Sequence, residues 1–173
     1  MDVPSAWQDS KDILMMKRLL VLAACGWALT NAAALAAPAP AVNDGYDWAM
    51  RVNEDRVSDA ILAYEVDGTD DQPLNFRCEQ GGNRIFAGIS GNSPDLKAIK
   101  LVSGNATLRV TGTTDVDEMP YFSSEEIAGG SAFITAFAAN GWLRMTDGGG
   151  TVAMAGTASG KQAIKRFIAF CTG

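Results

Sequence analysis

An apolar N-terminal stretch constrains this chain most strongly, because it divides residues that direct export from residues that can fold. Lys17 and Arg18 precede the run Leu19–Ala24, and small residues then accumulate up to Ala34-Leu35-Ala36. A basic start, an apolar middle and an A-x-A ending are typical of a secretory signal peptide. We therefore predict cleavage between Ala36 and Ala37.

Three further interpretations of this stretch stay open. Three aspartates precede the basic pair, which favours a translation start at Met15 or Met16. Leu22-Ala23-Ala24-Cys25 resembles a bacterial lipobox, and a lipoprotein anchored at Cys25 is the minority alternative. The span from Leu19 to Ala37 is also just long enough to remain as an uncleaved membrane anchor.

With cleavage as the main interpretation, the chain has three parts. Residues 1–36 form an N-terminal extension plus cleavable signal peptide, residues 37–45 a flexible leader, and residues 46–173 a single exported domain. A domain of that size has room for one hydrophobic core. We expect a periplasmic or secreted protein with no membrane span after processing.

The composition excludes several classes of function. The chain has no His, which removes Ser-His-Asp and Cys-His nucleophiles and the commonest metal ligand. Its 14 Lys and Arg against 20 Asp and Glu give a net charge of -6, whereas a nucleic-acid-binding protein needs a basic face. We expect no nucleic-acid partner.

Two of the three cysteines remain after the signal peptide is removed. An even pair, Cys78 and Cys171, in an exported protein is most simply one disulfide. In the chain-entropy model, so long a closed loop stabilises the fold by up to about 4–5 kcal/mol. Two unpaired buried thiols are the alternative.

Alternating apolar residues predict an antiparallel sheet. The predicted strands are residues 60–66, 74–79, 84–89, 106–111, 142–146 and 151–155, with residues 119–122 as an edge strand because Pro120 cannot donate to a ladder. The stretch 95–102 is ambiguous. Cys78 falls on the inward face of its strand.

Two helices complete the prediction. An Ala- and Phe-rich helix spans 131–139 and stops at Asn140-Gly141. The C-terminal helix begins at a capping box, Ser159 and Gln162, and places Cys171 on its apolar face. The predicted fold class is α+β: a small antiparallel β-sheet domain with a central helix and a C-terminal helix tied to a strand by one disulfide.

The sequence contains no strong catalytic or metal-binding motif. Three acidic clusters stand out in predicted turns: Asp67/Asp70/Asp71, Asp115/Asp117/Glu118 and Glu125/Glu126. They have neither the alternating spacing nor the distal bidentate Glu of a calcium loop. A pair of carboxylates serves glycoside hydrolysis, but acids in turns are usually solvated. We therefore predict no catalytic, cofactor-binding or metal-ligating residue, and no enzyme activity.

Two other motifs have simpler structural interpretations. The segment Gly156–Gln162 lies between a strand and a helix, but it lacks the spacing of a Walker A loop and has Gln after Lys161. A helix cap explains it better. We expect Trp48, Tyr64, Phe76, Phe86 and Trp142 in core packing rather than around a ligand.

An arrangement of fixed residues resembles the periplasmic type VI secretion-associated proteins of the TagO/VasI kind. In that family a Trp opens the domain, an L-x-x-R-C strand carries the first Cys, and a Gly precedes a helix with an internal Ala and a closing Cys. The corresponding residues here are Trp48, Leu74, Arg77, Cys78, Gly156, Ala163 and Cys171. Asp55–Asp59 meets the family's acidic-serine signature loosely, and residues 95–126 have no counterpart. The C-terminal hairpin, the glycine after it and the Ala-containing helix are also similar to invasion-associated locus B-type exported proteins.

The resemblance implies an envelope accessory role and names no catalytic residue. The leading hypothesis is a non-enzymatic exported accessory or protein-binding domain, whose partner is another envelope or secretion-system protein. The first alternative is an exported inhibitor that blocks a hydrolase with the loop Asp67–Pro73. The second is a hydrolase that uses the acidic clusters.

Overall fold

The computed structural model describes residues 36–53 and 55–173. The predictions on the signal peptide, the translation start and Cys25 fall on residues 1–35 and lie outside the described residues. In the described part of the chain no helix is long and apolar enough to cross a membrane.

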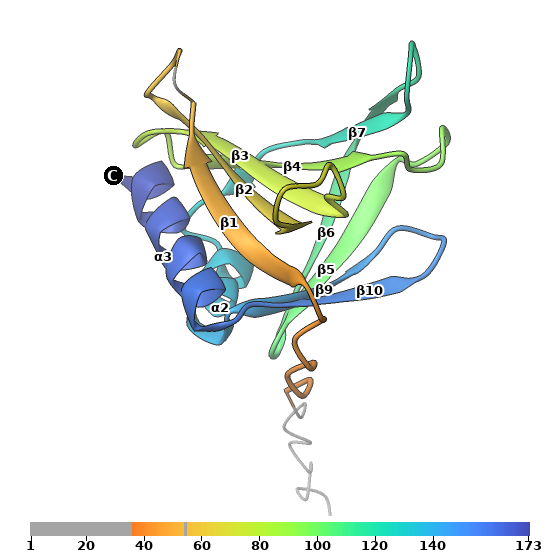
Figure 1. Cartoon of the computed structure of the whole chain (residues 1–173). Coiled ribbons are helices and arrows are strands. Elements are labelled where there is room, and N and C mark those ends of the chain that lie inside the picture. The colour runs from red at the N-terminus through yellow and green to blue at the C-terminus, as the bar shows by residue number, and fades with distance from the viewer. Residues whose placement is uncertain (1–35, 54) are drawn as a thin grey trace, which may run out of the picture. The chain divides into compact units, whose positions relative to one another are not determined.

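Ten strands form one antiparallel sheet in the described residues. The strands are β1 (Tyr46–Val52), β2 (Asp59–Val66), β3 (Leu74–Glu79), β4 (Arg84–Ser90), β5 (Ala98–Ser103), β6 (Ala106–Asp115), β7 (Tyr121–Ser124), β8 (Ile127–Ala128), β9 (Trp142–Thr146) and β10 (Thr151–Ala155). Their order is β1-β2-β3-β4-β7-β6-β5-β9-β10, and the short β8 pairs with β4. The sheet curls until β10 approaches β1, so it forms a nearly closed barrel (Figure 1).

Local sequence explains the hairpins that build this sheet. Apolar residues alternate along β2, where Ala60, Leu62 and Tyr64 are all buried in the core. The two-residue turn between β5 and β6 begins with Gly104 at φ +60°. Glycine tolerates that backbone conformation without steric cost, and a positive φ at the first central position suits the right-handed twist of a hairpin.

Two helices pack together and against the sheet. Helix α2 (Ala132–Asn140) begins at Ser131, whose side chain accepts from the Ile134 amide, and ends at Gly141 in the left-handed region. Helix α3 (Ala158–Thr172) lies along β1 and β2 and contacts α2 (Figure 1). An aromatic cluster joins these layers, because the Trp48 ring of β1 lies 5.0 Å from the Phe137 ring of α2.

A disulfide links Cys78 of β3 to Cys171 of α3, with Cα atoms 5.7 Å apart. Both cysteines are buried in the core. The C-terminal helix is therefore tied covalently to an interior strand of the sheet. A buried disulfide is typical of proteins that fold in an oxidising compartment outside the cytoplasm.

The segment before β1 has no regular structure apart from a turn at residues 44–45. The Ala37 amide donates to the Gly104 carbonyl at 3.0 Å, and the Arg144 guanidinium donates to the Pro38 carbonyl at 2.8 Å. These hydrogen bonds connect the segment to the β5–β6 turn and to β9.

The structure agrees in outline with the predicted α+β class, with its antiparallel strands and two helices. It differs in the extent of the sheet, because a small sheet is predicted and a ten-stranded, barrel-like sheet is observed in the described residues. The prediction of an edge strand at residues 119–122 is wrong, because β7 lies between β4 and β6. Pro120 directly precedes β7, so its missing amide costs the ladder nothing.

The predicted capping box is also wrong. Helix α3 begins two residues earlier, and Thr157 is the N-cap whose side chain accepts from the Gly160 amide. The Ser159 hydroxyl donates instead to the Asp47 carboxylate at 3.1 Å. The error arose because Ser and Thr at neighbouring positions are both good N-caps, and only the backbone geometry distinguishes them.

Candidate functional site

The three acidic clusters lie on exposed turns. Asp67, Asp70 and Asp71 are in the β2–β3 loop, Asp115, Asp117 and Glu118 are at the β6–β7 turn, and Glu125 and Glu126 separate β7 from β8. Within the described ranges no hydrogen bond joins one cluster to another, and no group of three His, Cys, Asp or Glu side chains is placed to hold a metal ion.

A groove of about 750 Å³ opens on the outer face of β1–β4, the face turned away from the core. It carries four arginines and two carboxylates among its lining residues, which gives the lining a net charge of +2 in a chain of -6. The lining consists of Arg51, Val52, Asn53, Arg56, Asp59, Ala60, Ile61, Arg77, Cys78, Glu79, Gly82, Arg84 and Phe86. This groove is the candidate site.

The groove floor is a row of side chains that crosses four strands. Strand register pairs Arg51 of β1 with Ile61 of β2, Ile61 with Arg77 of β3, and Arg77 with Phe86 of β4. Directly opposite residues share one face of a sheet, and neighbouring strands are about 4.8 Å apart. The row, here called the outer row, therefore alternates cationic and apolar side chains over about 15 Å.

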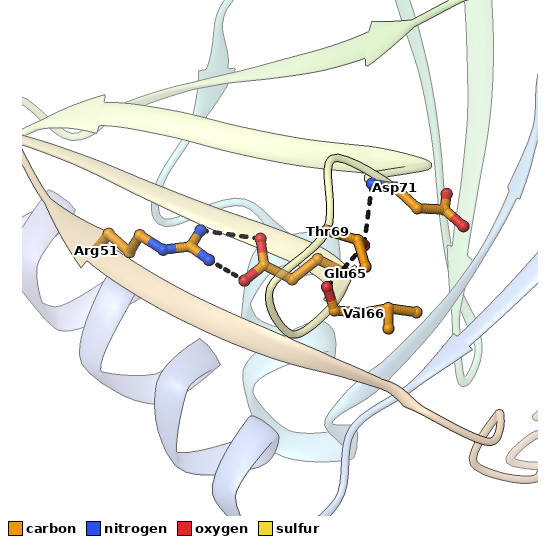
Figure 2. A network of polar contacts seen from close by, with 5 residues as sticks. All are labelled: Arg51, Glu65, Val66, Thr69 and Asp71. Carbon is orange, nitrogen blue, oxygen red and sulfur yellow. Dashed lines mark hydrogen bonds and ion pairs between the residues drawn. The ribbon is translucent and has the colours of Figure 1, made fainter.

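Arg51 is held in place by a buried carboxylate. Its guanidinium donates two hydrogen bonds to Glu65, one of them at 2.9 Å from Nη1 to Oε2 (Figure 2). Glu65 is only 4% exposed. The hydrogen bond to Glu65 raises the pKa of Arg51, so this side chain is charged at any physiological pH. A forked pair of this kind fixes both position and orientation.

Arg77 is oriented by an aromatic ring and not by a carboxylate. Its guanidinium carbon lies 5.4 Å from the centre of the Tyr121 ring. The Tyr121 hydroxyl approaches Asn75 Oδ1 at 3.4 Å, and the ring lies where a side chain on Gly88 would stand. Glycine at position 88 therefore makes room for the tyrosine that supports Arg77.

The two remaining arginines form exposed ion pairs. Arg84 Nη2 lies 3.6 Å from Glu79 Oε2, with both side chains more than half exposed. Arg56 Nε lies 3.3 Å from Asp59 Oδ2 on the β1–β2 hairpin. Exposed pairs of this kind contribute little stability, so these side chains can change partners at small cost.

Sequence patterns alone predict little of this groove. Phe86 was predicted in the core, but it is half-buried on the outer face and lines the groove. The core side of β4 is occupied by its neighbours Ile85 and Ala87, because side chains alternate along a strand. The alternation of side chains along a strand indicates that Arg51, Arg77 and Arg84 can face outward. Only the strand register shows that these arginines lie close together on one face of the sheet.

The segment Gly156–Gln162 has a structural role. Asp47 of β1 accepts from the Thr157 amide at 2.9 Å, from the Thr157 hydroxyl and from the Ser159 hydroxyl. Burial alone would raise the pKa of Asp47, but these hydrogen bonds together lower it below its ordinary value. The carboxylate thus binds the N-terminus of α3 and joins the helix to β1.

No protein-family model matches the sequence, and neither a curated protein nor a solved structure matches it. The groove must therefore be interpreted from its own chemistry.

Proposed function

We propose that this chain is a non-enzymatic exported accessory domain that binds an acidic segment of a protein partner in the groove. The observation that carries the proposal is the concentration of arginines on one sheet face of an acidic protein. Arginine is enriched in protein interfaces because its planar fork pairs with carboxylates and its stem packs on apolar groups. The volume also falls within the range of binding pockets.

The contacts of the lining carboxylates support binding over catalysis. Asp59 and Glu79 face each other across β2 and β3, but each contacts an arginine of its own. A partner segment that brings its own carboxylates can replace these weak pairs. Export follows from the predicted signal peptide and agrees with the buried disulfide.

The resemblance to type VI secretion-associated proteins makes a component of that apparatus the first partner to seek. The test is purification of the tagged, disulfide-bonded protein from its own envelope fraction, followed by mass spectrometry. The double variant R77E/R84E reverses charge in the groove, and R109E reverses charge on the exposed face of β6 as the matched control.

We expect the wild type and R109E to retain a partner protein that R77E/R84E does not retain. Equal retention by all three forms, or no retained protein, would contradict the proposal. Secretion-system components among the retained proteins would support the finer assignment to type VI secretion.

An inhibitor role is the second candidate, favoured by the ordering of the exposed loop Asp67–Pro73. The Thr69 hydroxyl donates to the Val66 carbonyl at 2.9 Å and accepts from the Asp71 amide at 3.2 Å (Figure 2). The Tyr46 hydroxyl also binds the Asp71 carboxylate. Loops held in one conformation suit the blocking of an enzyme. A retained hydrolase that the purified protein inhibits, and that D70A fails to inhibit, would favour this role.

A further inference from the structure

The groove is more than a charged surface, because its four arginines differ in what they already contact. The guanidinium of Arg51 is forked onto Glu65, and the guanidiniums of Arg56 and Arg84 each have a carboxylate within 4 Å. Arg77 makes no ion pair with any residue in the described ranges 36–53 and 55–173. The fork of Arg77 is thus the cation of the groove that remains open to a ligand.

The guanidinium of Arg77 is also held in position before a ligand binds. The Tyr121 ring supports one face of its guanidinium, and Tyr121 is itself fixed against Gly88 and Asn75. An arginine held this way loses less side-chain entropy on binding than a free one. Arg51 lies two strands away, about 10 Å along the row, but its charge is already compensated by buried Glu65.

The neighbours of Arg77 in the row are apolar. Ile61 and Phe86 lie directly opposite it on the two adjacent strands, and both are only partly buried. A ligand that reaches the Arg77 fork therefore also covers an aliphatic and an aromatic side chain. Burying that apolar surface favours binding.

On the premise that the proposed function is right, we infer that the groove recognises a partner segment with a carboxylate beside an apolar side chain. The carboxylate accepts two hydrogen bonds from Arg77, and the adjacent apolar side chain packs on Ile61 and Phe86. One open guanidinium matches one negative charge. A phosphate dianion fits less well, because the other three arginines of the groove are already paired with carboxylates and leave its second charge without a cation.

The test is an NMR titration of the oxidised protein with three peptide probes. The probes are acetyl-Gly-Glu-Leu-Gly-amide, the same peptide with Gln for Glu, and the same peptide with phosphoserine for Glu. Arginine Nε–Hε resonances and backbone amides report where each probe binds. R77Q removes the charge, R77K keeps the charge without the fork, and R109Q is the control on β6.

We expect the Glu peptide to shift the Arg77 Nε–Hε resonance and to bind about tenfold or more tightly than the Gln peptide, because a hydrogen bond to a charged group is lost. R77Q should abolish the preference for Glu, R77K should reduce it, and R109Q should leave it unchanged. Since Arg77 is exposed, these variants should keep the wild-type amide spectrum elsewhere.

Equal binding of the Glu and Gln peptides, a preference that survives R77Q, or tighter binding of the phosphoserine peptide would each overturn the inference. If a partner is still retained by the wild type and lost by R77E/R84E, only the ligand chemistry is wrong and the proposed function stands. If neither a peptide nor a partner distinguishes R77E/R84E from R109E, both fail.

Discussion

Removing the Cys78–Cys171 disulfide should be the most destabilising small change in this domain. The two residues are 93 positions apart, so the bond closes most of the domain into one loop. In the chain-entropy model a loop of that length stabilises the folded state by about 4–5 kcal/mol at 25 °C. Domains are commonly stable by only about 5–15 kcal/mol, so the bond supplies a large share.

The perturbation is the double variant C78A/C171A, measured by urea unfolding followed by tryptophan fluorescence. Alanine keeps both buried positions apolar, and the lost sulfur packing adds about 1 kcal/mol. With a urea m-value of about 2 kcal/mol/M, a total loss of about 5–6 kcal/mol should lower the midpoint by about 2.5–3 M. The m-value itself should rise, because the uncrosslinked unfolded chain exposes more surface.

Reduced wild-type protein is the matched control, since it lacks the bond but keeps both sulfur atoms. Its unfolding free energy should lie within about 1 kcal/mol of the double variant's. A loss below about 1 kcal/mol in both samples would refute the reasoning, because the loop would then have little entropy to restrict in the unfolded chain.

Three further predictions concern the helix junction and the arginine support. D47N should lose about 1 kcal/mol of stability at neutral pH. The lowered pKa of Asp47 means that its contribution to stability is present above about pH 4 and is lost as pH falls through the folded-state pKa. Over that window the free energy of unfolding of D47N should therefore fall less steeply with pH than that of the wild type. T157A should cost about 1 kcal/mol in urea unfolding as the N-cap, and S159A clearly less; the reverse order would restore the capping-box prediction. G88A should displace the Tyr121 ring, seen as a changed ring-proton shift, and weaken peptide binding without touching the groove directly; an unmoved ring would contradict the support geometry.

Local patterns predicted much of the secondary structure, because alternation and helical spacing act over a few residues. Helix α2 was expected at 131–139 and spans Ala132–Asn140. Strand β1 is not among the predicted strands, although Trp48 and Met50 follow strand spacing. Strand β5 lies largely in the stretch 95–102, whose pattern is ambiguous. The near closure of the sheet was not predicted, since β4–β7 and β5–β9 pair across long sequence separations.

The groove was harder to predict than the fold. An arginine on a strand is most often a solvated residue, and nothing local marks Arg77 as different from Arg109. The difference comes from three long-range facts: Phe86 and Ile61 lie beside Arg77, and Tyr121 lies against it. Such a site depends on strand register, which one sequence specifies only through its turns and its buried face.

The central claim, that the outer groove holds a partner segment, is tested most directly by crosslinking inside the cell envelope. A photo-crosslinking amino acid at position 86 lies in the groove, and one at position 107 on the exposed face of β6 is the matched control. The account predicts a discrete crosslinked protein from position 86 that is absent from position 107 and is lost when R77E is added. Identical products from both positions, or a position-86 product unaffected by R77E, would contradict it.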